Sequence, residues 1–171
     1  MLQTRVLRIP KKRIKHLLEH KDEIEKYANV KIDVNNEIKI SGESFDIFLA
    51  SDVIKAIGRG FNYETAAKLF KDYTLYVIPI AKNRNELIRI RARLIGTKGK
   101  VKKKIEELTN TNISIYGKTV SIIGKGDKLN LARIAIEKII AGYSHSNVFR
   151  FLKSSILRRS FEKEEEYEED L

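Results

Sequence analysis

The sequence predicts an α+β fold made of two copies of one β-α-α-β-β-α unit, each a three-stranded antiparallel sheet packed by helices. Two observations support this prediction. Apolar residues alternate as in strands or recur as in amphipathic helices, and these segments follow one another in the same order in both halves of the chain. The second observation is an internal repeat, because apolar residues and glycines recur at a spacing of 81 or 82 residues.

The repeat divides the chain into two halves. A spacing of 81 relates Ile24 to Ile105 and Asn29 to Asn110, and further along the chain a spacing of 82 relates Gly60 to Gly142. The extra residue falls in a predicted hairpin turn, where an insertion costs little free energy. We therefore expect one domain over residues 1–73 and another over residues 74–150.

The elements of the second copy follow from local periodicity and turn residues. The predicted order is a strand over 73–80, a helix over 83–95, a Gly-x-x-Gly turn over 96–99, a helix bearing Val101, Ile105 and Leu108 on one face, a hairpin over 112–123 and a helix over 127–141. The tight turn between two helices is the distinctive feature of this half.

The first copy departs from that pattern at the corresponding turn. Its first two helices are predicted over 11–19 and 22–28, and the residues joining them, Glu19-His20-Lys21-Asp22, include no glycine. Acidic side chains there would also repel phosphate. We expect the first copy to be degenerate, and to orient the second copy or to bind protein.

The C-terminal segment changes character within twenty residues. Residues 151–161 are predicted to form an amphipathic helix with Leu152, Ile156 and Leu157 on its apolar side. Residues 162–171 contain seven acidic residues and one lysine, a composition typical of a disordered acidic tail.

Charge and composition restrict the class of protein. The net charge is +11, and without the acidic tail the remaining 33 basic and 16 acidic residues give +17. Such a balance favours a polyanionic ligand, RNA or DNA, over the alternative of a lysine-rich solvated surface. The chain has no cysteine, which excludes disulfides and thiolate metal sites. Its first residues have no apolar signal core, so we expect no leader. We expect a cytoplasmic protein without a cofactor.

The strongest functional motif is the turn Gly96-Thr97-Lys98-Gly99. It lies in the 23-residue stretch 82–104, which holds ten basic residues and a single acid, Glu86. Glycines allow phosphates to approach backbone amides, and the helix that follows directs free N–H groups toward the same place. We predict that this turn holds a nucleic-acid backbone, and that Lys98 and Lys100 contact phosphates.

This turn within this order of elements resembles the type I K-homology (KH) domain, in which the turn clamps about four single-stranded nucleotides. The resemblance implies the following RNA-binding residues: Arg91, Ile95, Gly96, Thr97, Lys98, Gly99, Lys100, Lys103, Ile113, Ser114 and Ile115. One of the two isoleucines is expected in the core. Arg59 and His145 are possible additional RNA contacts, although the glycines beside Arg59 are also explained by a helix end.

A narrower resemblance rests on Arg8-Ile9-Pro10-Lys11, on 56–61, on 94–99, on 115–120 and on Ser144-His145. Over residues 4–155 the chain resembles the archaeal Dim-two, or partner-of-Nob-one, family of small-subunit ribosome biogenesis proteins. The resemblance implies binding near the 3′ end of small-subunit ribosomal RNA through the second copy. It also implies two protein partners, the endonuclease Nob-one and the alpha subunit of initiation factor two.

Other functions remain as alternatives or are disfavoured. One alternative is a protein–protein adaptor that links a ribosome assembly or initiation factor to pre-ribosomal RNA, a role that can coexist with RNA binding. Another is a general mRNA-binding protein. No catalytic cluster is apparent, because His16, His20 and His145 are scattered in the sequence, and for the same reason no metal site is predicted. Gly117-Lys118-Thr119 resembles the end of a P-loop but lacks its first glycine and lies in a hairpin.

Overall fold

The computed structural model describes the backbone of residues 2–169, with side chains except at 165 and 167–169. The strands are β1 (Gln3–Leu7), β2 (Lys31–Val34), β3 (Ile38–Gly42), β4 (Thr74–Pro79), β5 (Asn112–Tyr116) and β6 (Thr119–Gly124). The helices are α1 (Lys11–Glu19), α2 (Lys21–Ala28), α3 (Ser44–Gly58), α4 (Tyr63–Ala66), α5 (Arg84–Ile95), α6 (Lys100–Thr109), α7 (Gly126–Ile140) and α8 (His145–Glu169), with 3₁₀ turns η1 (Ala67–Phe70) and η2 (Thr97–Gly99).

The α+β prediction is confirmed, because the strands form two three-stranded antiparallel sheets. Their orders are β1-β3-β2 and β4-β6-β5, so in each sheet the last strand in the sequence lies in the centre. Arg5 and Ile32 both pair with Ile40 in the first sheet, and Tyr76 pairs with Ile122 in the second. The order β-α-α-β-β-α occurs in both halves of the chain, as the repeat predicts.

The chain divides into two compact units that do not coincide with its two repeats. The first unit contains Met1–Pro79 with Ser114–Lys125, and the second contains Ile80–Ile113 with Gly126–Leu171. The strands β4 and β6 thus belong to the first unit, and the helices α5, α6, α7 and α8 belong to the second.

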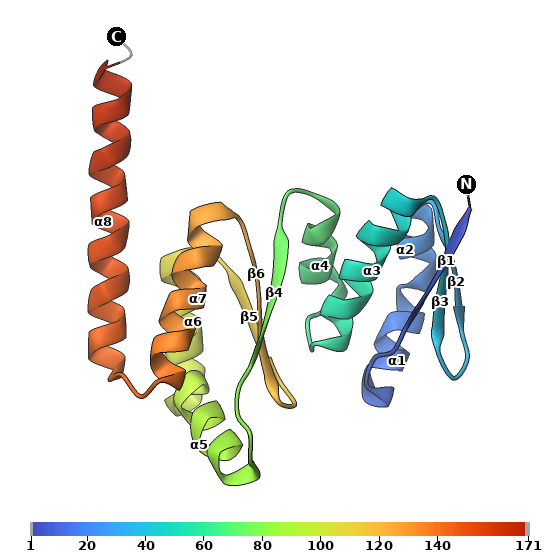
Figure 1. Ribbon diagram of the computed structural model, residues 1–171, viewed down its shortest axis with the longest axis horizontal. Helices are drawn as coiled ribbons and strands as arrows, with labels where there is room; N and C mark the ends of the chain where they lie inside the picture. The colour runs from blue at the N-terminus through green and yellow to red at the C-terminus, as the bar shows by residue number, and fades with distance from the viewer. Residues whose placement is uncertain (1, 170–171) are drawn as a thin grey trace. The chain divides into compact units, whose positions relative to one another are not determined.

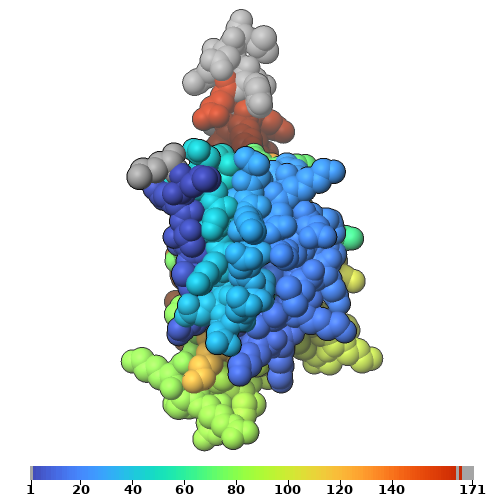
Figure 2. All heavy atoms as spheres, turned by 90° about the vertical axis from the view of Figure 1, so that its right-hand side faces the viewer, coloured from blue at the N-terminus to red at the C-terminus, as the bar shows by residue number. Residues whose placement is uncertain are grey.

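In the first unit, α1, α2 and α3 cover one face of the sheet β1-β3-β2 (Figure 1). Leu17, Ile24, Ile40 and Ile54 are fully buried in this core, because apolar residues alternate along the strands and recur at helical spacing along the helices. The other face of the sheet is exposed, and Figure 2 shows its strands at the surface.

In the second unit, α5, α6 and α7 bury one apolar stripe each. Ile90 and Leu94 of α5, Ile105 of α6 and Ile136 of α7 are almost fully buried. The long helix α8 packs against α6 and α7, and its Leu152 is completely buried. Among the described residues, no helix is both long enough and apolar enough to cross a membrane.

The repeat extends to individual hydrogen bonds. Glu25 Oε1 accepts the backbone N–H of Ile32 at 2.7 Å, and Glu106 Oε1 accepts that of Ile113 at 2.8 Å. Asn29 and Asn110, which follow α2 and α6, both have left-handed backbones, with φ of 53° and 49°. Asparagine tolerates this conformation better than most residues, so both copies end their second helix in the same way.

The C-terminal helix differs from its prediction in both bounds. It was expected over 151–161, whereas α8 begins at His145 and continues to Glu169, through most of the segment predicted to be disordered. Glutamate and lysine are good helix formers, so a helix that is already anchored continues through such a sequence. Residues 170–171 of the predicted tail lie outside the described residues.

Candidate nucleic-acid interface

The predicted turn lies between two well-formed helices of the second unit. The side chain of Asn83 accepts the N–H of Glu86 at 2.9 Å, and the Glu86 carboxylate accepts the N–H of Lys82 at 3.3 Å. This reciprocal capping defines the start of α5. The helix ends at Ile95, Gly96 and the 3₁₀ turn η2 follow, and α6 starts at Lys100. The capped helix holds the turn in one place.

The two glycines of the turn are required for different reasons. Gly96 has φ of +73°, and a Cβ there would lie 2.4 Å from Cγ2 of Val101. No side chain larger than hydrogen therefore fits at Gly96. Gly99 also has a positive φ, +74°, but nothing lies within 4 Å of a Cβ at that position. A substitution at Gly99 strains the backbone without a collision.

Lys98 occupies the left-handed region between these glycines. Its φ and ψ are 54° and 29°, a conformation that costs a residue with a Cβ free energy. Gly96, Lys98 and Gly99 therefore all have positive φ within four residues. Strained non-glycine backbone of this kind is concentrated at functional sites. Lys98 is also exposed, so its ammonium group points to solvent at the tip of the turn.

The lysines around the turn separate into two groups. Lys98, Lys100 and Lys103 are exposed. Lys102 forms an ion pair with Glu106, with 3.8 Å between Nζ and Oε1, and Nζ of Lys104 lies 4.2 Å from the ring centre of Phe149. The structure therefore leaves the three predicted RNA-binding lysines at the surface and engages the other two within the second unit.

Arg93 has a structural role that the sequence did not reveal. Its guanidinium donates to the backbone carbonyls of Ile139 and Tyr143, at 2.8 and 2.5 Å, and so caps the end of α7. Arg13 of the first unit makes the same pair of bonds, to the carbonyls of Ile57 and Phe61, at 2.7 and 2.6 Å. Arg91, a predicted site residue, is half-buried on the same helix as Arg93.

His145 is engaged in the second unit. Its Nε2 lies 2.9 Å from the backbone carbonyl of Arg93, where it donates a hydrogen bond that ties the start of α8 to α5. Its ring lies beside that of Phe149, with 6.4 Å between the centres. The structure thus gives His145 an anchoring role in the second unit, and its RNA contact stays a prediction.

The strand residues predicted to line a base-binding groove are in different environments. Ile113 is only 4% exposed and serves as core, the role expected for one isoleucine of the pair, whereas Ile115 is half-buried. The hydroxyl of Ser114 donates to the backbone carbonyl of Arg59 at 2.7 Å, and the Arg59 side chain donates to Thr119 at 3.3 Å. Two hydrogen bonds thus join Arg59 to the β5–β6 hairpin within the first unit.

One prediction about metals needs correction, because two histidines that looked scattered lie together. Ligand atoms of His16, Glu19 and His20 all lie within 4.8 Å of one another. However, Nε2 of His16 accepts the N–H of Tyr63 at 3.1 Å, so a neutral ring carries its proton on Nδ1, the atom that faces Glu19. A cation would have to displace that proton, and the cluster is better described as a hydrogen-bonded network.

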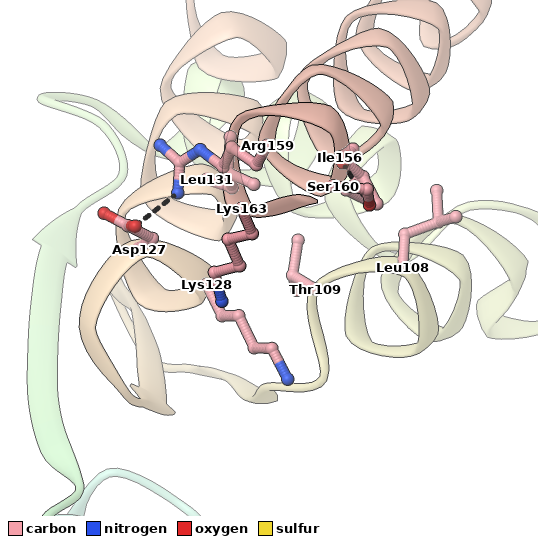
Figure 3. A pocket seen from close by; sticks show the side chains of 9 residues that line it. All are labelled: Leu108, Thr109, Asp127, Lys128, Leu131, Ile156, Arg159, Ser160 and Lys163. Atoms are coloured by element: carbon pink, nitrogen blue, oxygen red, sulfur yellow. Dashed lines mark hydrogen bonds and ion pairs between the residues drawn. The ribbon is translucent and has the colours of Figure 1, made fainter. Parts of the chain in front are cut away.

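A separate hollow of about 180 Å³ lies between α6, α7 and α8 of the second unit (Figure 3). Leu108, Leu131 and Ile156 form its apolar wall, and Asp127 pairs with Arg159 at its edge, with 3.2 Å between oxygen and nitrogen. None of the predicted RNA-binding residues lines this hollow.

Comparison with known proteins identifies one domain family and several relatives. Residues 74–156 match the family of the second KH domain of PNO1, a eukaryotic type KH-domain of type I. A KH domain-containing protein of Methanocaldococcus jannaschii is 36% identical over 92% of this chain and 77% of its own length. The RNA-binding protein PNO1 of Oryzias latipes is 32% identical over 67% of this chain, and the match covers 51% of that longer protein.

Two solved structures of Dim2p from Pyrococcus horikoshii are similar throughout. The isolated protein superposes with a TM-score of 0.82 at 35% identity, covering 89% of this chain and 99% of that one. A chain from the complex of a/eIF2alpha, aDim2p and rRNA superposes with a TM-score of 0.83 at 34% identity, covering 91% of this chain and 94% of that one.

Proposed function

The chain belongs to the archaeal Dim2 family, the relatives of eukaryotic PNO1, and we propose that it is an RNA-binding protein of small ribosomal subunit biogenesis. In this proposal it is built from two tandem KH-like domains and acts in the cytoplasm without catalysing a reaction. The second domain binds single-stranded RNA near the 3′ end of small-subunit ribosomal RNA. The complex of Pyrococcus horikoshii aDim2p with rRNA supports the RNA-binding part of this proposal.

The observation that carries the proposal is the backbone of the turn Gly96–Gly99. Positive φ at Gly96, Lys98 and Gly99 directs the chain tightly from α5 into α6, whose first N–H groups have no partner inside the helix. A phosphate placed there gains those N–H donors and the positive end of the helix dipole. Lys98, Lys100 and Lys103 add charge at the surface around it.

The remaining predicted residues have supporting roles in this proposal. Ile95 is half-buried at the end of α5, next to the turn, where its apolar side chain is available to a base, and Thr97 is exposed within the turn. Each phosphate neutralised should steepen the salt dependence of binding by a slope of about 0.7 on single strands. Three phosphate contacts would therefore give a slope of about 2.

The proposal is tested with Gly99→Asp rather than with a substitution at Gly96. Because nothing lies within 4 Å of a Cβ at Gly99, the new carboxylate repels phosphate without disturbing the packing. Gly126→Asp is the matched control, since Gly126 also has a positive φ and open space around its Cβ. Binding is measured by fluorescence anisotropy with the labelled 3′-terminal segment of small-subunit ribosomal RNA and with a scrambled strand, at two salt concentrations.

The expected result is a loss of binding of tenfold or more in Gly99→Asp, equal to about 1.4 kcal/mol or more, with near-normal binding by Gly126→Asp. Preference for the ribosomal segment that survives higher salt supports the ribosomal assignment over a general mRNA-binding role. Unchanged affinity of a folded Gly99→Asp protein would refute the clamp.

A second candidate function is that of an adaptor. It is favoured by one observation, the presence of a/eIF2alpha in the complex that holds aDim2p of Pyrococcus horikoshii together with rRNA. We propose that this chain likewise binds the alpha subunit of initiation factor two, and by family resemblance the endonuclease Nob-one. If protein binding is independent of the turn, Gly99→Asp will leave the pull-down of the alpha subunit unchanged while RNA binding falls.

A further inference from the structure

The first unit carries a surface groove walled by aromatic side chains from three neighbouring segments. Tyr27 comes from α2, Tyr63 from α4, Phe70 from η1, and Tyr73 follows η1 in the chain. The groove has a volume of about 340 Å³, and the other residues that line it are Glu64, Ala67, Lys68 and Lys71. The groove therefore has aromatic walls and cations, and Ala67 is its single aliphatic lining residue.

Two pairs of rings at this groove lie face to face. The centres of Tyr27 and Phe70 are 4.3 Å apart with 26° between their planes, and those of His20 and Tyr63 are 4.6 Å apart with 8° between them. Phe70 covers one face of Tyr27, yet 61% of Tyr27 remains exposed. An open aromatic face beyond an existing stack is a place where one more flat ring continues the stack.

Cations surround the same rings. Lys71 lines the groove and is exposed, and Nζ of Lys68 lies 5.6 Å from the ring centre of Tyr73. Lys125 lies over Tyr73 at 4.5 Å and pairs with Asp72 at 2.8 Å, so that acid is neutralised locally. Glu64 is the one acid among the lining residues, and the lining as a whole is therefore positive.

We propose that this groove is a second binding site for single-stranded nucleic acid, in which a base stacks on Tyr27 while Lys68 and Lys71 contact the backbone phosphates. Aromatic platforms flanked by cations bind single strands without sequence preference, because every base has a flat face. All the residues of the site belong to the first unit, whose own helix junction lacks the glycine turn, so the site does not depend on Gly96–Gly99.

Nucleic acid fits this groove better than a protein does. Lys68 and Lys71 line the groove against the single acid Glu64, so its charge complements a phosphate backbone, and its flat rings offer a stacking face to any base. Stacking should contribute most of the free energy of binding. Two phosphate contacts, one for each lysine, predict a slope of about 1.4 for the salt dependence of binding to single strands. That slope is shallower than the slope expected for the turn with its three exposed lysines.

The test uses tryptophan fluorescence, because the chain has no tryptophan of its own. Tyr27→Trp places a single emitting ring on the proposed platform, and it should fold because Tyr27 is largely exposed. Phe45→Trp is the control, since Phe45 is 69% exposed and does not line the groove. Both variants are titrated with a ten-nucleotide oligouridine, with the natural turn and in a Gly99→Asp background.

Saturable quenching of the Tyr27→Trp variant in both backgrounds, with no quenching of the Phe45→Trp variant, is the expected result. In the Gly99→Asp background, Tyr27→Ala should weaken residual binding by about 5- to 150-fold, the range for losing one stacked base, while Tyr27→Phe keeps it. Absence of quenching of the Tyr27→Trp variant in both backgrounds would overturn the proposal and leave the groove to a protein partner. The inference rests on the chain's nucleic-acid function, but loss of binding in Gly99→Asp alone tests the turn, so the two can fail separately.

Discussion

Glu106 accepts a hydrogen bond from the backbone N–H of Ile113, with 2.8 Å between the carboxylate oxygen and the nitrogen. The bond joins the middle of α6 to the strand that follows it. Its counterpart in the first repeat, from Ile32 to Glu25, has almost the same length, 2.7 Å. In each copy, the glutamate therefore fixes the position of the following strand relative to the second helix.

Glu106→Ala should destabilise the protein by about 1–3 kcal/mol, because a strand N–H loses its charged acceptor. Glu106→Gln should destabilise the protein less, since its amide oxygen still accepts the hydrogen bond from Ile113. Urea unfolding measures both, with the exposed neighbour Glu107→Ala as control. An alanine variant that unfolds at the same urea concentration as the parent would show that water replaces the carboxylate without cost.

Arg93→Lys should lower the free energy of unfolding by about 1.5–3 kcal/mol, because an ammonium group cannot reach the carbonyls of both Ile139 and Tyr143. The exposed Arg89 on the same helix provides the control, since Arg89→Lys should be nearly neutral. Thermal unfolding compares the two. Equal melting temperatures for both variants would mean that the two hydrogen bonds that cap α7 do not stabilise the protein.

Gly60→Ala should be more destabilising than Gly142→Ala, although the two glycines are repeat equivalents with φ of +98° and +101°. Both substitutions strain the backbone by about 1–3 kcal/mol. Only at Gly60 does the new Cβ also meet a neighbour, 2.6 Å from Oγ of Ser114. In a double-mutant cycle, adding Ser114→Ala to Gly60→Ala should recover part of the lost free energy of unfolding. Additive effects of the two substitutions would show that the Cβ and the Ser114 hydroxyl do not collide.

Lys98→Asn should separate stability from binding. Asparagine accepts the left-handed backbone at this position more readily than lysine, so stability should rise by up to about 1 kcal/mol. RNA affinity should fall at the same time, with the salt slope reduced by about 0.7. Lys103→Asn, in the regular helix α6, should lower affinity without the gain in stability. A less stable Lys98→Asn protein would argue against strain at the turn.

His16 should make the protein less stable as the pH falls below neutrality. Burial, and then the charges of Arg13 and His20, lower the pKa of His16 from its usual 6.5. The unfolded chain therefore takes up the proton at a higher pH than the folded protein does. The stabilisation is present above pH 6.5 and is lost as the pH falls through the folded pKa.

The physical reason is that Nε2 of His16 accepts the N–H of Tyr63, and a protonated ring cannot accept it. The groups that face this ring are Arg13, Glu19, His20 and the Tyr63 backbone. His16→Gln should therefore flatten the decline in urea stability between pH 7 and 5. If the stability of the His16→Gln variant depends on pH in the same way as that of the parent, this explanation is wrong.

The local pattern predicted the elements well because helix and strand periodicity are properties of neighbouring residues. The strand β4, the helix α5 capped by Asn83 and the turn at Gly96 follow directly from local sequence. The end of α8 was missed, because whether a glutamate-rich segment stays helical depends on the anchored helix before it rather than on its own composition.

The partners of polar side chains were harder to predict. Arg91 and Arg93 look alike in the sequence, but only the structure shows that Arg93 caps α7. Ser114 is predicted at an RNA groove, and only the structure shows that its hydroxyl donates to the carbonyl of Arg59, 55 residues away. The division of Lys102, Lys103 and Lys104 into engaged and exposed side chains likewise required the positions of Glu106 and Phe149.

The α+β class, the repeat, the order of elements and the place of the turn Gly96–Gly99 could be predicted, since each of these depends on spacing along the chain. Only the folded molecule shows which cations remain at the surface, which histidines are engaged, and that Tyr27, Tyr63 and Phe70 line one groove. These features depend on how helices far apart in the sequence are rotated against one another, and that rotation is set by the packing of the whole core rather than by any local pattern.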